Sequence, residues 1–348
     1  MSDHRPIRAV FASEFWTGAT ARSLLPALRA RGWQVELLDT RDFFSGSSSL
    51  VGRIAARLGR GRSSKAFNQA ILDAANQPEV DVFLTVKGTD IDTGTIRTLR
   101  AAGVFCANFY PDYHFNDTGI EAVAAYDLIC TTKSFHVDPL RKQAGSGHVA
   151  FIHHGYSDEF HRAPSALKRR RDVDVLYIGN AGPAKIAWMI ALANELPGIG
   201  IRLVGAGWSK AAKGTALELH ETLPAQRGEA YANEIARARI VLAFHNGADP
   251  ATGFADLVST RTFEIPACGG FMLHVDNDEV RSLYDVPREI ETFTTVDNCA
   301  AKIRYWLAHP EEREAVAARG HARAVPAYGY ATRARELAEL IEERLANR

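Results

Sequence analysis

The chain has 348 residues, of which 46% are hydrophobic and 24% charged, and its 41 basic and 41 acidic residues leave no formal net charge. This balance excludes a protein that binds nucleic acid through overall basicity, and it excludes an acidic disordered chain. Four scattered cysteines without a C-x-x-C pair argue against a disulfide framework or a structural zinc site. The N-terminus lacks the apolar core of a signal peptide, and no run of 18 apolar residues occurs, so a cytoplasmic location is expected.

The first 150 residues alternate apolar stretches of strand length with segments of helical period. Strands are predicted at 7–12, 35–38, 80–86, 104–109, 128–131 and 149–153. Helices are predicted at 18–31, 65–76, 93–102, 119–125 and 137–143. This alternation predicts a parallel sheet with helices on both faces.

A polar stretch at 154–172, with Pro164 and four successive basic residues, interrupts the pattern. A second α/β pattern follows, with strands at 173–178, 201–204, 240–244, 271–274 and 290–293 and helices at 184–196, 231–238, 260–267, 300–308 and 311–319. An amphipathic helix at 331–345 comes last. We therefore predict a first domain at 1–153, a linker at 154–172, a second domain at 173–330 and a terminal helix at 331–348. Ligands of such domains bind at the carboxyl ends of the strands, here in a cleft between the two.

The loops after several predicted strands contain glycines at the start of a helix, where free N–H groups favour an anion. They do not complete G-x-G-x-x-G, since Lys210 stands where the third glycine would be, and no G-x-x-x-x-G-K-[ST] occurs. A nicotinamide enzyme, a flavin enzyme and a P-loop protein are therefore disfavoured. The residues that these loops single out are Thr17, Gly18, Gly179, Asn180, Lys185 and Gly207.

The stretch 256–270 carries the most informative pattern, because Asp256 and Glu264 stand eight positions apart with Arg261 between them. In a helix over 260–267, Arg261 lies in the first turn, where its charge adds to that of the helix N-terminus and suits a diphosphate. Glu264 lies one turn later and can accept hydrogen bonds from two vicinal hydroxyls of a ribose. The alternative is a surface helix on which the arginine and the glutamate form a salt bridge.

The segment from Arg261 to Phe271, RTFEIPACGGF, resembles the donor-site segment of glycosyltransferases with the GT-B fold. It is most similar to the group 1 glycosyltransferases that include the spore-maturation-type enzymes. The acidic pair resembles the E-x7-E element of the retaining glycosyltransferase family 4, with Asp256 in place of the first glutamate. The resemblance covers residues 173–345 and implies two Rossmann-like domains that face a cleft, with the terminal helix crossing back to the first domain.

The resemblance implies retaining, metal-independent transfer of a hexosyl or related group from a nucleotide diphosphate sugar to a hydroxyl of a glycan, a lipid-linked or a small-molecule acceptor. It implies no cofactor. Glu264 would hold the ribose, and Arg261 and Lys185 would neutralise the diphosphate. The donor-side candidates are Gly179, Asn180, Lys185, Gly207, His245, Asn246, Ser259, Thr260, Arg261 and Glu264, and the catalytic candidates are Asp112, His114 and Asp256.

Some of these candidates allow two interpretations, one functional and one structural. Asp112 and His114 follow a strand of the first domain and could orient or deprotonate an acceptor hydroxyl, or be a turn residue and a surface histidine. His245 and Asn246 follow the strand at 240–244 and could touch the donor sugar, or His245 could be a buried residue that caps the strand end.

The stretch from Gly46 to Lys65 contains five basic residues and no acidic one. It falls between a strand and a helix of the first domain, which would bind the acceptor, and we expect a loop there. Thr17 and Gly18 are further acceptor-side candidates in the same domain. Its apolar residues share one helical face between arginines such as Arg53 and Arg57, which would suit an anionic acceptor or peripheral contact with the inner face of a membrane. A solvated basic loop is the alternative. Two other functions stay open for the whole chain: a nucleotide-sugar epimerase of GT-B fold, and a non-catalytic two-lobed protein that binds a sugar or nucleotide.

Overall fold

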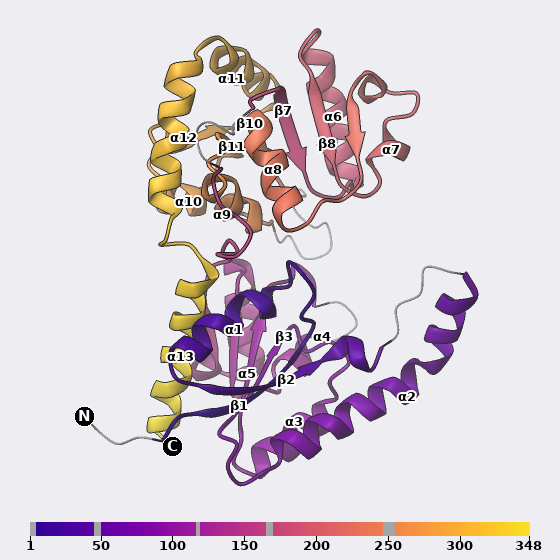
Figure 1. The fold of residues 1–348 in the computed structure, drawn as a ribbon, viewed down its shortest axis with the longest axis vertical. Coiled ribbons are helices and arrows are strands. Elements are labelled where there is room, and N and C mark those ends of the chain that lie inside the picture. The colour runs from indigo at the N-terminus through magenta and orange to yellow at the C-terminus, as the bar shows by residue number, and fades with distance from the viewer. Residues whose placement is uncertain (1–4, 45–49, 116–118, 165–169, 246–254) are drawn as a thin grey trace. The chain divides into compact units, whose positions relative to one another are not determined.

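The computed structural model describes the chain apart from residues 1–4, 45–49, 116–118, 165–169 and 246–254, and of residues 50–58 it describes only the backbone. The chain folds into two compact units (Figure 1). The first consists of Met1–His154 and Tyr330–Arg348, and the second of Gly155–Gly329. Each unit contains a six-stranded sheet whose neighbouring strands all run parallel.

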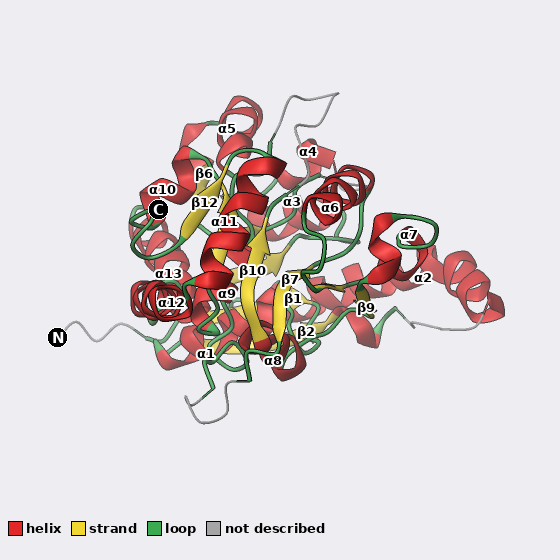
Figure 2. Ribbon diagram, turned by 90° about the horizontal axis from the view of Figure 1, so that it is seen from above, coloured by secondary structure: helices red, strands yellow, loops and turns green. Residues whose placement is uncertain are grey.

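The first unit has a sheet in the order β2-β1-β3-β4-β5-β6. Its strands are β1 (Arg8–Ser13), β2 (Gln34–Asp39), β3 (Val82–Val86), β4 (Phe105–Tyr110), β5 (Leu128–Thr131) and β6 (Val149–Phe151). Its helices include α1 (Thr20–Ala30), α2 (Leu50–Ala75), α3 (Thr93–Ala101), α4 (Gly119–Val123) and α5 (Val137–Ala144). The central strands are buried throughout because helices cover both faces of the sheet (Figure 2).

The last helix, α13 (Tyr330–Ala346), belongs to the first unit although the whole second unit precedes it in the chain. Its buried side chains share one apolar cluster with Leu24 and Leu28 of α1. At the rim of this contact, Glu342 accepts hydrogen bonds from Arg31 at 2.8 and 2.6 Å and from the indole of Trp33 at 2.9 Å. The two helices therefore close one face of the sheet together.

Helix α2 corrects the expectation of a loop over 46–64. The helix begins at Leu50 and continues without interruption to Ala75, and residues 46–49 lie outside the described part of the chain. Alanine, leucine and arginine are strong helix formers, and in this stretch they outweigh the destabilising effect of three interior glycines. The C-terminal half is held by Phe67 and Ile71, which are fully buried under the sheet.

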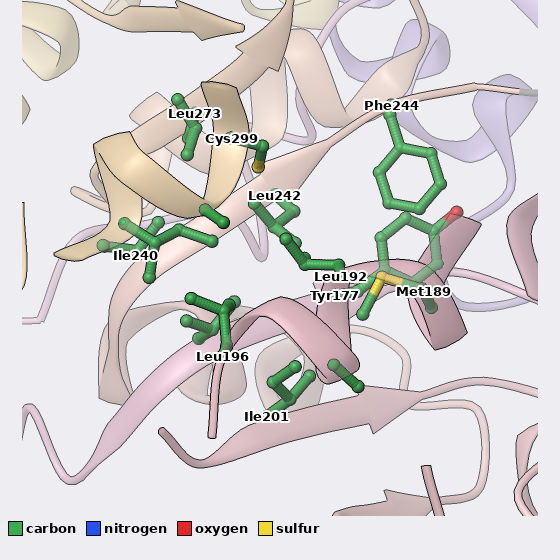
Figure 3. Close-up of a cluster of buried hydrophobic side chains, with 14 of the residues drawn as sticks. Tyr177, Met189, Leu192, Leu196, Ile201, Ile240, Leu242, Phe244, Leu273 and Cys299 are labelled. Carbon is green, nitrogen blue, oxygen red and sulfur yellow. The ribbon is translucent and has the colours of Figure 1, made fainter. Parts of the chain in front are cut away.

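The second unit has a sheet in the order β12-β11-β10-β7-β8-β9. Its strands are β7 (Val173–Ile178), β8 (Ile201–Val204), β9 (Glu221–Leu223), β10 (Ala238–Ala243), β11 (Met272–Val275) and β12 (Glu291–Phe293). Its helices are, among the described residues, α6 (Pro183–Glu195), α7 (Trp208–Ala211), α8 (Glu229–Arg237), α9 (Thr260–Ala267), α10 (Asp278–Leu283), α11 (Val296–Ala308) and α12 (Pro310–Ala324). Figure 3 shows one of its apolar clusters, in which Leu242 of β10 packs against Leu192 of α6.

The stretch expected to form a linker is mostly part of the second unit. His154 lies in the first unit, and the second begins at Gly155. Tyr156 pairs with Gly329 in an isolated parallel bridge, and Arg171 donates hydrogen bonds to backbone carbonyls of Ala236, Ala238 and Gly269. At least one of the basic residues that suggested a solvated connection, Arg171, is therefore bonded inside the second unit.

Candidate functional site

Two loops at the carboxyl ends of β7 and β8 are joined by hydrogen bonds in the second unit. The Gly179 amide donates to the Val204 carbonyl at 2.8 Å, and the Ala206 amide donates to the Asn180 side-chain oxygen at 3.0 Å. The indole of the buried Trp208 donates to the Gly179 carbonyl at 2.7 Å. Gly179 has φ +151° and Gly205 packs directly on the Gly179 carbonyl, so neither position leaves room for a side chain. These contacts fix the backbone of the β7–α6 loop.

Arg261, in the first turn of α9, reaches this loop. A Cβ added to Gly179 would lie 2.7 Å from an Nη atom of Arg261. The guanidinium donates to the Phe244 carbonyl at 3.2 Å and lies 5.5 Å from the ring centre of Tyr177. Its buried Nε has no hydrogen-bond partner among the described residues. Burial lowers the pKa of Arg261, but the neighbouring tyrosines and carboxylates raise it overall, so the group is charged and has donors to spare.

The start of α9 is held in place by a short chain of hydrogen bonds. The amide of Ser259 donates to the Thr262 hydroxyl at 3.2 Å, and that hydroxyl lies 2.9 Å from Nε2 of His274. Burial lowers the pKa of His274 to about 4, so its ring is neutral. Its Nδ1 lies 2.6 Å from the Val275 carbonyl and donates to it, which leaves Nε2 to accept from Thr262. These hydrogen bonds therefore fix the orientation of the N-terminus of α9, which begins at Thr260.

Glu264 lies one turn further along α9 and does not pair with Arg261 in the described structure. Its Oε2 accepts a hydrogen bond from the Tyr231 hydroxyl at 2.6 Å, and its Oε1 lies 3.8 Å from Nδ1 of His161. The contacts of Arg261 run instead to the Phe244 carbonyl and His245. The geometry thus disagrees with the alternative of a simple salt bridge along a surface helix.

The other donor-side candidates of the second unit surround these two. His245 is buried after β10, with its Nδ1 3.9 Å from Asp256 and 3.5 Å from the Arg261 guanidinium. Lys185, in the first turn of α6, lies 3.4 Å from the Asn180 carbonyl. Gly207 precedes α7 with φ +90°. Asn246 lies outside the described residues.

Sequence reasoning missed four residues that shape this edge, namely Tyr177, Trp208, Tyr231 and His161. Tyr177 and Trp208 look like core residues in the sequence, and both are fully buried. Tyr231 lies on α8, and His161 lies in the stretch that resembled a linker. No motif links either of them to Glu264, because their contacts with it depend on the tertiary fold.

The carboxyl edge of the first unit carries a charged pair. Asp112, just after β4, lies 3.0 Å from the ammonium of Lys87, just after β3. Lys87 has φ 70°, a conformation unfavourable for a residue other than glycine. The backbone there is held by two hydrogen bonds, from the Lys87 amide to the Phe109 carbonyl at 3.0 Å and from the Asn108 side chain to the Lys87 carbonyl at 3.2 Å. The structure therefore retains a strained backbone that brings an ammonium to Asp112.

The other candidates of the first unit are less constrained. His114 is exposed, and its ring packs edge-on against Tyr113 with the centroids 4.5 Å apart. Thr17 and Gly18 are exposed between β1 and α1. Arg53 and Arg57 lie in α2, where side chains are not described.

Three histidines of the first unit are neutral: His136 and His154 are buried, and His153 is half-buried. Burial lowers the pKa of both His136 and His153 to about 4. His154, with its pKa lowered further by burial, lies 2.8 Å from the Thr132 hydroxyl. We therefore assign these histidines a structural role in the first unit.

Three further observations concern the described residues as a whole. All four cysteines are buried free thiols. No group of three or more His, Cys, Asp and Glu side chains within the described ranges is arranged to hold a metal ion. Among the helices of that part of the chain, none is both long and apolar enough to cross a bilayer.

Comparisons with known proteins agree with this geometry. Residues 181–339 match the family model described as "Glycosyl transferase-like". A search of curated protein sequences finds no match.

Among solved structures, HepE from Anabaena in complex with UDP-glucose superposes with a TM-score of 0.65 at 14% identity, over 97% of this chain and 100% of that chain. Sucrose-phosphate synthase from Thermosynechococcus elongatus gives 0.68 at 15%, over 99% and 100%. AviGT4, a glycosyltransferase involved in avilamycin A biosynthesis, gives 0.62 at 16%, over 99% of each chain. The predicted GT-B fold is confirmed, and the match over residues 181–339 agrees with the resemblance to glycosyltransferases.

Proposed function

We propose that the protein transfers a sugar from a nucleoside diphosphate sugar to an acceptor hydroxyl, with the donor bound by the second unit and the acceptor by the first. The observation that carries the proposal is the position of Arg261, a buried cation at a helix N-terminus that faces the Gly179 loop instead of Glu264. A diphosphate is the natural ligand of such an arrangement. The UDP-glucose complex of HepE supports a donor of this class.

In this reaction the bond between the sugar C1 and the diphosphate oxygen breaks, and a bond between C1 and the acceptor oxygen forms. Negative charge accumulates on the departing diphosphate. Arg261, the N-termini of α6 and α9, and Lys185 in the first turn of α6 stabilise that charge. Because these groups supply the positive charge, we assign no metal and no cofactor to the reaction.

On the nucleoside side, Glu264 accepts hydrogen bonds from the ribose hydroxyls. His245, which lies beside the Arg261 guanidinium, and Asp256, which lies beside His245, are assigned to the donor sugar. We include retention of the anomeric configuration in the proposal, in line with the spacing of Asp256 and Glu264.

On the acceptor side, the acceptor hydroxyl attacks C1 and its proton passes to the departing diphosphate oxygen. Asp112, held by Lys87, is the group that we assign to orient this hydroxyl. Thr17 and Gly18 border the same sheet edge, after β1. The N-terminal half of α2 carries Arg53 and Arg57 and extends away from the sheet (Figure 1), and we assign it to an anionic acceptor or to the surface of a membrane that contains one.

A panel of nucleotide sugars tests the proposal. Thermal shift first identifies the donor that stabilises the protein, and nucleoside diphosphate release is then measured with and without candidate acceptors. A glycosyltransferase releases the diphosphate in step with acceptor glycosylation. An epimerase would convert the donor without an acceptor, and a binding protein would be stabilised without turnover, so either result would overturn the proposal.

The variant Glu264→Ala sharpens this test. It removes the ribose contact, and we expect transfer to be abolished while the thermal unfolding of the unliganded protein stays within a few degrees. Full turnover in this variant would contradict the assignment of the donor site.

A further inference from the structure

Glu264 is enclosed by two residues from different parts of the second unit. Tyr231 on α8 donates to Oε2 at 2.6 Å, and His161 approaches Oε1 with its Nδ1 at 3.8 Å. The rings of Tyr231 and His161 lie 5.2 Å apart at an angle of 46°. The Ser157 amide donates to Nδ1 of His161 at 3.0 Å, which holds the imidazole in place.

The protonation states of both neighbours follow from burial. Burial and the charge of Glu264 raise the pKa of Tyr231 well above its ordinary value, so the phenol stays protonated. Its hydroxyl therefore donates a hydrogen bond to the Glu264 carboxylate. Burial lowers the pKa of His161, so its ring is neutral. Since Nδ1 already accepts from Ser157, the ring proton is on Nε2, and His161 offers no hydrogen to Glu264 from the side that faces it.

The two oxygens of Glu264 therefore differ. Oε2 is occupied by the Tyr231 hydroxyl, whereas Oε1 accepts no hydrogen bond from the described residues and keeps its capacity to bind a ligand hydroxyl. A glutamate side chain without the tyrosine would be free to rotate about its terminal bond and would lose this distinction.

We propose that Tyr231 is a positioning residue that holds one oxygen of Glu264 so that the other meets a ribose hydroxyl, and that it thereby sets the preference for ribonucleotides over deoxyribonucleotides. This inference rests on the proposed function, because it takes the ligand of Glu264 to be the ribose of a nucleoside diphosphate. A site built to hydrogen-bond a hydroxyl discriminates strongly against the analogue that lacks it. Misplacement of the accepting oxygen weakens that discrimination without affecting the rest of the ligand.

The test is the affinity ratio between a ribonucleotide and its dideoxy analogue. Isothermal titration of the full chain with UDP, ADP, GDP and CDP identifies the diphosphate that binds most tightly, and its 2′,3′-dideoxy form is then titrated. For Tyr231→Phe we expect the ratio to fall about fivefold to tenfold, with the dideoxy affinity within twofold of the wild type. Glu264→Ala should abolish the preference.

The matched control is Tyr328→Phe. Its hydroxyl is also buried in the second unit but donates to the Leu283 carbonyl at 2.6 Å, so its loss should leave the ratio unchanged. If Tyr231→Phe is unstable at 25 °C, the same ratio is measured at lower temperature with the osmolyte trimethylamine N-oxide, which stabilises the folded state without restoring the hydroxyl.

Two outcomes overturn the inference and are distinguishable. If the wild type prefers the ribonucleotide through Glu264 but Tyr231→Phe retains that preference, Tyr231 is only structural and the proposed function stands. If the wild type binds none of the four diphosphates, the proposed function fails and the inference fails with it.

Discussion

The carboxyl edges of the two sheets are built from the same α/β units but present different chemistry. In the second unit, glycine loops after β7 and β8 are hydrogen-bonded to each other, and one buried cation, Arg261, reaches them. In the first unit, the loops after β3 and β4 present an opposite-charge pair of side chains, Lys87 and Asp112. The second unit thus offers backbone and one fixed charge, and the first offers side chains.

This difference fits the proposed division of roles, with the donor on the second unit and the acceptor on the first. A diphosphate is the same in every nucleotide sugar, and fixed backbone groups with the cations Arg261 and Lys185 would suit it. An acceptor varies in shape and charge, and side chains on loops provide specific contacts for it. Substitutions at the two edges should therefore have effects that differ in kind.

The largest effect is expected at Arg261. In Arg261→Ala, kcat/KM for the nucleotide sugar should fall about 100-fold to 1000-fold, because the charge of the departing diphosphate loses its main partner. Steady-state kinetics with the donor identified by thermal shift measures this. Arg281→Ala is the control, since Arg281 forms a partly exposed ion pair with Asp276 on the same unit. A loss of less than tenfold at Arg261 would break the comparison.

Acid should destabilise both units, and the first unit more. The pKa values of His136 and His153 in the first unit, and of His274 in the second, are lowered by burial from 6.5 to about 4. The unfolded chain therefore binds more protons than the folded chain between these values. The stabilisation is complete above pH 6.5 and is lost as the pH falls toward 4, by about 2 kcal/mol for each histidine at pH 5.

Hydrogen exchange at pH 7 and pH 5 measures amide protection in each of the two units separately. Amides of the first unit should lose more protection at pH 5 than those of the second. In His153→Gln the excess loss in the first unit should shrink by about 2 kcal/mol. Equal losses in the two units would remove this part of the comparison.

A smaller effect is expected from a methyl group at Gly179. In Gly179→Ala the new Cβ would lie 2.7 Å from Arg261 and force the guanidinium to move, and we expect donor affinity to fall about tenfold. Gly198→Ala is the matched control, because Gly198 also has a positive φ, +80°, but has open space around it. It should lose stability without losing donor affinity. Equal binding by the two variants would show that Arg261 need not remain in contact with the loop.

The smallest effect is expected at Lys87. In Lys87→Met, Asp112 loses its partner at 3.0 Å, and we expect the KM for the acceptor to rise about fivefold while nucleoside diphosphate affinity stays constant. Lys142→Met, at an exposed position of α5, is the control. A change in nucleotide affinity at Lys87 would contradict the separation of roles between the two edges.

Much of this fold could be predicted from the sequence. The helix at Thr260–Ala267 and the strand at Leu128–Thr131 have the predicted bounds. The helix is followed by two glycines, and the strand is a short apolar run between polar residues. The short elements β9, α7 and α10 were not predicted, because their sequences (ETL, WSKA and DEVRSL) contain polar residues and no continuous apolar run. The loop expected before residue 65 was wrong, since the helix propensity of the alanines, leucines and arginines outweighs the three glycines there.

The site was predictable only where a motif carries it. Arg261 and Glu264 could be singled out because helical spacing and the glycine pair after them are local features. Their partners could not, since Tyr231 and His161 reach Glu264 from 33 positions away on another helix and from a polar stretch without a motif. Arg261 contacts the Phe244 carbonyl after β10, whereas Glu264 contacts Tyr231 on α8. This difference also depends on the tertiary fold.

The return of α13 to the first unit has a consequence for the order of synthesis. A ribosome delivers all of Gly155–Gly329 after most of the first unit and before its last helix. At about 5–20 residues per second, the apolar face formed by Leu24 and Leu28 waits for roughly ten seconds or more without its cover. The second unit, which is continuous in the chain, can be finished while the first is still open, so the nascent chain exposes the face that α13 covers until translation has passed Tyr330.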